Sequence, residues 1–89
     1  MPKAEVSWKR TTDEGVKLQV TAQRVGGEWR FSKRHKRFDQ WMPVPEPPLE
    51  DWLELLDAVR RLITRRRLQP IHEEHLVRRI RERFPEAEV

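Results

Sequence analysis

Apolar and polar residues alternate through the first third of the chain, as expected for β-strands with one buried face. Val6 and Trp8 alternate with polar residues, and so do the apolar positions 16, 18, 20 and 22 and the pair Trp29 and Phe31. Side chains of a strand point to opposite faces with a period of two. The alternation therefore predicts strands over residues 4–12, 16–25 and 28–34.

Two short segments that contain glycine separate these strands and fix their register. We interpret Gly26-Gly27 as a two-residue hairpin loop and residues 13–15, which end in Gly15, as a three-residue loop. Glycine suits both loops because each needs a residue with positive φ. The Gly26-Gly27 loop makes Val20 face Lys33, Ala22 face Phe31 and Arg24 face Trp29. The 13–15 loop makes Val6 face Ala22, Trp8 face Val20, Arg10 face Leu18 and Thr12 face Val16.

The two loops agree on which residues share a face of the sheet, and this agreement supports the register. The apolar face holds Val6, Trp8, Val16, Leu18, Val20, Ala22, Trp29 and Phe31. The opposite, polar face holds Lys9, Lys17, Arg30 and Arg34 together with Gln19, Thr21 and Gln23.

The segment after residue 34 has a weaker pattern. Phe38, Trp41 and Met42 are apolar, which is consistent with a short fourth strand over residues 38–42. Prolines follow at positions 43, 45, 47 and 48, and proline ends strands and holds the chain extended. We therefore predict a stiff connector over residues 43–48.

The remainder of the chain predicts two helices, because its apolar residues recur every three or four positions. The first helix covers about residues 48–67 and is ended by Pro70, and the second runs from residue 71 or 72 to 84. The predicted fold is α+β: an antiparallel meander of three strands, or of four if residues 38–42 add a strand, followed by two helices packed on one sheet face. Its helical core residues are Trp52, Leu53, Leu56, Val59, Leu76, Ile80 and Phe84.

Length and composition predict a single small domain over residues 1–89. A chain of 89 residues can form one modest core, and neither half has enough apolar surface for a core of its own. There is no cysteine, no signal-peptide pattern and no apolar run near the ~20 residues of a membrane span. We therefore expect a cytoplasmic protein without a membrane partner.

Charge is abundant and unevenly distributed. Charged residues make up 38% of the chain, and the net charge is +4. Residues 1–48 carry the whole excess, with ten lysines and arginines against six acidic residues, whereas residues 49–89 are balanced. In both predicted helices acidic residues come first and arginines last, which complements the helix dipole and needs no functional explanation.

The basic excess suggests binding of nucleic acid. The densest basic stretch is interleaved with aromatic residues, and single-stranded nucleic acid is held by cations at its phosphates and by rings stacked on its bases. Against this, the register places Trp29 and Phe31 on the buried face, and basic residues also protect a sheet from edge-to-edge aggregation. The candidate DNA-binding or RNA-binding residues are Lys9, Lys17, Arg30, Lys33, Arg34, Lys36 and Arg37.

An alternative function is protein–protein interaction or self-association. The apolar stripe of the first helix is wide enough for two neighbours, and Leu55 and Leu62 widen it. Trp41 lies beside the proline-rich connector, where an exposed ring could bind a partner protein. The candidate partner-binding residues are therefore Trp41, Leu55 and Leu62.

The chain gives no support for catalysis, a metal or a cofactor. His72 and His75 are three residues apart, whereas the zinc-protease motif needs four and a third ligand. The only other histidine, His35, lies in a basic stretch. Every glycine is assigned to a hairpin loop, so none remains for a phosphate-binding loop. We expect a non-enzymatic binding domain.

Overall fold

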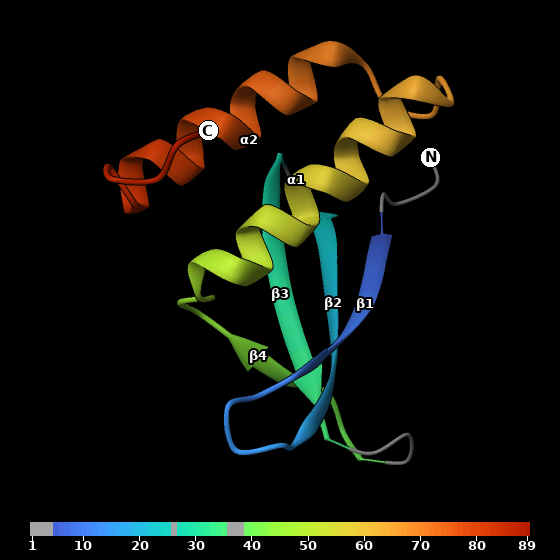
Figure 1. Cartoon of the computed structure of the whole chain (residues 1–89). Helices are drawn as coiled ribbons and strands as arrows, with labels where there is room; N and C mark the ends of the chain where they lie inside the picture. The colour runs from blue at the N-terminus through green and yellow to red at the C-terminus, as the bar shows by residue number, and fades with distance from the viewer. Residues whose placement is uncertain (1–4, 26, 36–38) are drawn as a thin grey trace. The chain divides into compact units, whose positions relative to one another are not determined.

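The computed structural model describes residues 5–25, 27–35 and 39–89 and shows the predicted α+β class with a meander (Figure 1). A four-stranded antiparallel sheet is followed by two helices. The elements are β1 Glu5–Thr11, β2 Lys17–Val25, β3 Glu28–Arg34, β4 Met42–Val44, α1 Leu49–Thr64 and α2 Pro70–Arg83. The chain divides into a sheet unit, Met1–Pro47, and a helix unit, Pro48–Val89. Packing of the helices on a sheet face, and a single domain, stay predictions.

The predicted register between β1 and β2 is confirmed. Val6 lies opposite Ala22, and Trp8 lies opposite Val20. The loop closes with the Thr12 amide donating to the Val16 carbonyl at 2.8 Å. Gly15 has φ +84°, and a Cβ built there would meet nothing within 4 Å. Glycine is therefore favoured at this position by backbone conformation rather than by lack of space.

The register between β2 and β3 is confirmed as well. Ala22 lies opposite Phe31, and Val25 lies opposite Glu28, so the loop between them has two residues. Gly27 has φ +84°, as a two-residue hairpin loop requires. Gly26, the other residue of this loop, lies outside the described residues.

The apolar face of the sheet is buried along its central strands. Leu18, Val20, Ala22 and Phe31 are all buried, and Phe31 makes an edge-to-face contact with Trp8, with ring centroids 6.1 Å apart. Val16, which we expected in this apolar set, is exposed instead. It lies beside the 13–15 loop, beyond the end of β2, where the sheet offers it few neighbours.

The fourth strand is present but shifted from its predicted position. β4 covers Met42–Val44 and contains Pro43, although we expected the prolines to follow the strand. Pro43 lies opposite Ser32 on β3. Hydrogen-bonded pairs alternate with non-bonded pairs along an antiparallel ladder. The two-residue loop makes Val25 and Glu28 a bonded pair, so Ser32 bonds to β2 and not to β4. The nitrogen of Pro43, opposite Ser32, therefore points away from β3. An edge strand tolerates proline at such a position because no ladder bond is lost.

Helix α1 ends earlier than predicted, at Thr64, in a turn that reverses the chain. The Arg66 amide donates to the Ile63 carbonyl at 2.9 Å, and the Arg67 amide donates to the Leu62 carbonyl at 2.8 Å. This hydrogen-bond pattern is a Schellman motif. Arg66 occupies its left-handed position with φ 60°, where glycine is the usual residue.

Substituting Arg66→Gly is expected to stabilise the protein by about 1 kcal/mol. A left-handed conformation costs a residue with a side chain about 1–2 kcal/mol, and glycine removes this cost. Glycine also makes the unfolded chain more flexible, which offsets part of the gain. Chemical denaturation of both proteins measures the difference. The control is Arg65→Gly, at φ −86°, which is expected to destabilise. Equal effects of the two substitutions would contradict this assignment of strain.

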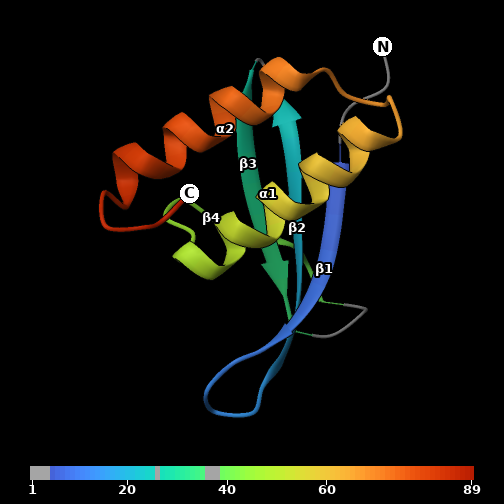
Figure 2. The same ribbon diagram turned by 45° about the horizontal axis from the view of Figure 1, so that its top comes forward.

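Helix α2 begins with Pro70 in its first turn, after Gln69 as the N-cap residue. We expected Pro70 to end the first helix and the second helix to begin at residue 71 or 72. Proline fits the first helical turn because its missing N–H has no partner there in any helix. The reversal at residues 65–69 makes α1 and α2 antiparallel neighbours (Figure 2). Arg60 pairs with Glu73 at 3.5 Å.

Most predicted helical core residues are buried: Trp52, Leu56, Val59, Leu76 and Ile80. Two are not, since Leu53 is exposed and Phe84 is half-buried at the end of α2. The Arg83 guanidinium also lies 5.6 Å from the centre of the Trp52 ring, within the range of a cation–π contact. Neither helix is both long enough and apolar enough to cross a membrane.

Candidate nucleic-acid interface

The polar face of the sheet gathers four of the basic residues predicted to bind nucleic acid. Lys9, Gln19 and Arg34 lie opposite one another in a row across β1, β2 and β3. Arg30 lies opposite Gln23 further along, and Lys17 lies opposite Thr11 near the other end. Because facing residues in a ladder project from the same side, these cations share one surface.

The remaining candidates do not join this surface in the described part of the chain. Lys33 lies opposite Val20 and Met42, so it projects from the apolar side. Adjacent residues of a strand point to opposite faces, and a basic run along one strand cannot form one basic patch. Lys36 and Arg37 lie outside the described residues.

Trp41 lies on Arg34, and this contact joins an exposed aromatic ring to the basic row. The Arg34 guanidinium carbon is 4.3 Å from the centre of the Trp41 ring, in a cation–π contact. The Arg34 Nε also donates to the Gln19 Oε1 at 2.5 Å. Two neighbours therefore hold the guanidinium, while Trp41 as a whole residue is 41% exposed. Trp41, which we had assigned to protein binding, thus lies beside the predicted nucleic-acid residues.

Charge is separated along the polar face. We call Lys9, Lys17, Gln19, Arg34 and Trp41 the basic end. At the opposite end two acidic residues share this face with Arg30. Glu28 lies two positions before Arg30 on β3, and Glu5 lies on β1, across Gln23 from Arg30. The ladder positions of the basic end hold no acidic residue, whereas those around Arg30 do.

Hydroxyl groups fill the middle of the polar face and bond to one another. Ser7 Oγ donates to Thr21 Oγ1 at 3.2 Å. Thr21 Oγ1 also lies 3.3 Å from Glu5 Oε1 and 3.1 Å from the Val6 carbonyl. Thr21 is buried, so this network holds the two strands together and leaves its hydroxyl poorly placed to act on a ligand.

The structure gives the burial of the two helix residues proposed for protein binding. Leu55 has no exposed surface, which does not favour a contact with a partner, and its assignment to protein binding stays a prediction. Leu62 is half-buried near the end of α1.

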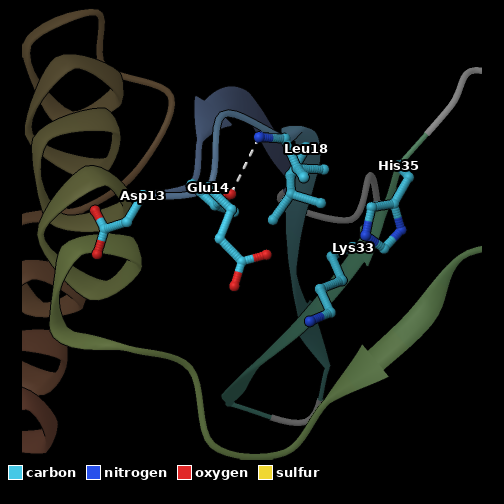
Figure 3. A pocket seen from close by; sticks show the side chains of 7 residues that line it. Asp13, Glu14, Leu18, Lys33 and His35 are labelled. Atoms are coloured by element: carbon cyan, nitrogen blue, oxygen red, sulfur yellow. Dashed lines mark hydrogen bonds between the residues drawn. The ribbon is translucent and has the colours of Figure 1, made fainter.

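A shallow hollow of about 340 Å³ lies on the apolar side of the sheet, beside the 13–15 loop. Its lining includes Glu14, Leu18, Lys33 and His35, and Figure 3 shows the Glu14 and Lys33 side chains extending into the same space. Asp13 also belongs to the lining. The lining therefore combines two acidic side chains with one lysine and one histidine, and it does not mark the hollow as a site for a ligand of one charge.

No three acidic or histidine side chains in residues 5–25, 27–35 and 39–89 are grouped to hold a metal ion. His72 and His75 both lie in the first half of α2. We therefore build the candidate site on the basic end alone.

Sequence reasoning found the cations of the basic end but not the role of Gln19 or the stacking of Trp41. The missing information was the register between β3 and β4, which no short turn motif marks. Comparison with profiles of known protein families, with curated proteins and with solved structures gave no match to this chain.

Proposed function

We propose that this protein is a non-enzymatic module that binds single-stranded nucleic acid on the polar face of its sheet. The observation that carries the proposal is the exposed residue Trp41, whose ring lies against the Arg34 guanidinium at the basic end. Cations that contact phosphates and an aromatic ring that stacks on a base are the two elements of single-strand recognition. A paired base in a duplex would not present its ring face to Trp41.

The geometry of the basic end supports this mode of binding. Lys9 and Arg34 lie on strands two apart, which places their backbones about 10 Å from each other at the usual strand spacing. A strand of nucleic acid that crosses β1, β2 and β3 would meet both cations and then reach Trp41. Gln19, between the cations, orients Arg34.

Arg34 has a double role in this proposal. Its guanidinium is planar, so it can stack on Trp41 and still present N–H groups to a phosphate oxygen. The hydrogen bond to Gln19 uses Nε and leaves the terminal nitrogens for that contact. The stack also restricts the motion of the Trp41 ring, which lowers the entropy lost when a base is bound.

Substituting Trp41→Ala is expected to weaken binding of an oligonucleotide of about 12 residues by roughly tenfold, because stacking contributes about 1–3 kcal/mol per base. Fluorescence anisotropy with oligo(dT) and oligo(U) measures this loss. The slope of log affinity against log salt should stay unchanged, since no charge is removed.

The matched control is Met42→Ala. Met42 is the next residue, it is 56% exposed, and it projects from the opposite face because it lies opposite Lys33. The proposal requires that this variant bind like the parent and that a duplex of the same length bind more weakly than the single strand. Absence of binding to any single strand at about 50 mM salt, or equal losses for the two variants, would refute it.

A further inference from the structure

The two edges of the sheet differ in their ability to accept another strand. β4 has three residues, and Pro43 in its middle lacks the outward N–H that a new neighbour would need. β1 has seven residues and no proline. Within the described chain, the strand order leaves the outer edge of β1 without a strand partner. Natural sheets protect such edges, and in the described strands the proline of β4 gives this protection whereas β1 has none of its own.

The hydrogen-bonding groups on the open edge belong to known residues. The Thr12 amide donates a hydrogen bond to the Val16 carbonyl. Bonded positions alternate along a strand, so the even-numbered residues of β1 are the ones whose backbone bonds to β2. The N–H and C=O groups of Glu5, Ser7 and Lys9 therefore point outward. A second strand on this edge would bond to these three residues.

We propose that two copies of this chain pair through β1, antiparallel and centred on Ser7, into a continuous eight-stranded sheet. In this register Glu5 of each copy lies opposite Lys9 of the other, and Ser7 lies opposite its counterpart. All three are positions with outward-pointing backbone groups. On the apolar side Val6 lies opposite Trp8 of the second copy.

Charge selects this register over its neighbours. Opposite charges directly across a ladder stabilise it, and like charges destabilise it. Centring the pair on Lys9 or on Glu5 would oppose like charges, and centring it on Trp8 would place Lys9 opposite Ser7 with no charge partner. Glu5 is already held on the polar face by its contact with Thr21, at 3.3 Å.

The pairing closes after two copies. The contact is isologous, so each chain uses the outer edge of β1 and leaves the proline-containing β4 at both ends of the assembly. The two polar faces then lie on the same side of the sheet. This inference does not depend on nucleic-acid binding and is tested without it.

The first test is a reciprocal charge exchange, followed by sedimentation velocity over about a hundredfold range of protein concentration. A Glu5–Lys9 pair contributes about 0.2–1 kcal/mol and occurs twice in the dimer. Lys9→Glu alone and Glu5→Lys alone are each expected to raise the dimer dissociation constant about tenfold. The combined variant E5K/K9E is expected to restore the parent value. A parent that stays monomeric throughout, or a combined variant no better than the single ones, would overturn the proposal.

The second test reads the register directly. The chain has no cysteine, so Ser7→Cys introduces its only thiol. Two such thiols would lie across one ladder pair, with Cα atoms about 5.5 Å apart, and a short thiol-specific crosslinker should join them. Thr11→Cys is the matched control on the same strand and face, and its two copies would lie about 27 Å apart. The proposal predicts crosslinking at least tenfold faster for Ser7→Cys, and equal rates would exclude this register.

Discussion

Reversing the charge of Lys9, Lys17 and Arg34 together is expected to weaken binding of single-stranded nucleic acid by at least about 100-fold, since charged hydrogen bonds contribute about 1.5–3 kcal/mol each. The three residues occupy the basic end and share one face of the sheet. Repulsion of the phosphates adds to the loss of attraction. Anisotropy titrations with oligo(dT) and oligo(U), repeated at several salt concentrations, measure the effect.

The control variant has the same change in net charge, but its three charge reversals are placed in the helix unit. Arg65, Arg67 and Arg78 are all exposed, and their combined replacement by glutamate should leave binding within about a factor of three if the basic end is the site. A neutral variant with glutamine at positions 9, 17 and 34 should reduce the salt slope by about 2, at roughly 0.7 per lost phosphate contact. Equal losses for the two charge-reversed proteins would show that binding depends on net charge alone.

The Leu55→Ala variant is expected to lose about 3 kcal/mol of unfolding free energy, which is the usual cost of removing a fully buried leucine side chain from a core. Leu55 has no exposed surface and lies in the middle of α1. In a chain of this size the loss corresponds to a decrease in melting temperature of roughly 15 °C. Urea denaturation and thermal melting both report it.

Leu53→Ala is the matched control for this second prediction. Leu53 lies on the same helix and is 40% exposed, so its truncation is expected to cost less than about 1 kcal/mol. Both variants replace leucine by alanine inside the same helix, so the change in helix propensity is the same and only the burial of the side chain differs. If the two variants melted together, the burial of Leu55 would not contribute to stability as we argue.

The sheet could be predicted from sequence almost residue by residue, because its determinants are local. Gly15 and Gly27 take the positive φ angles that short hairpin loops require, and each loop then dictates the pairing of its two strands. The termini of the helices were less predictable. Proline was expected to end a helix at position 70 and a strand at position 43, but it begins the helix and lies inside the strand. Proline is tolerated at both positions because neither one needs a backbone N–H to donate a hydrogen bond.

The candidate site was only half predictable for a related reason. Strand periodicity assigned Lys9, Lys17 and Arg34 to one face, but the contact between Arg34 and Trp41 spans a loop without a recognisable turn motif. The burial of Leu55 was missed because the width of an apolar stripe does not reveal whether its neighbours belong to the same chain. Pairings set by short loops were accessible from sequence, whereas contacts set by longer connections were not.

The strand order, in which each strand pairs with the next one along the chain, has a consequence for folding kinetics. Each pairing step joins two strands that are adjacent along the chain, so little entropy is lost in closing the loop between them. Topologies with such local pairing fold faster than sheets with crossover connections. The strands precede the helices along the chain, so they leave the ribosome first, and the meander can begin to form from its N-terminal hairpin before the helices emerge.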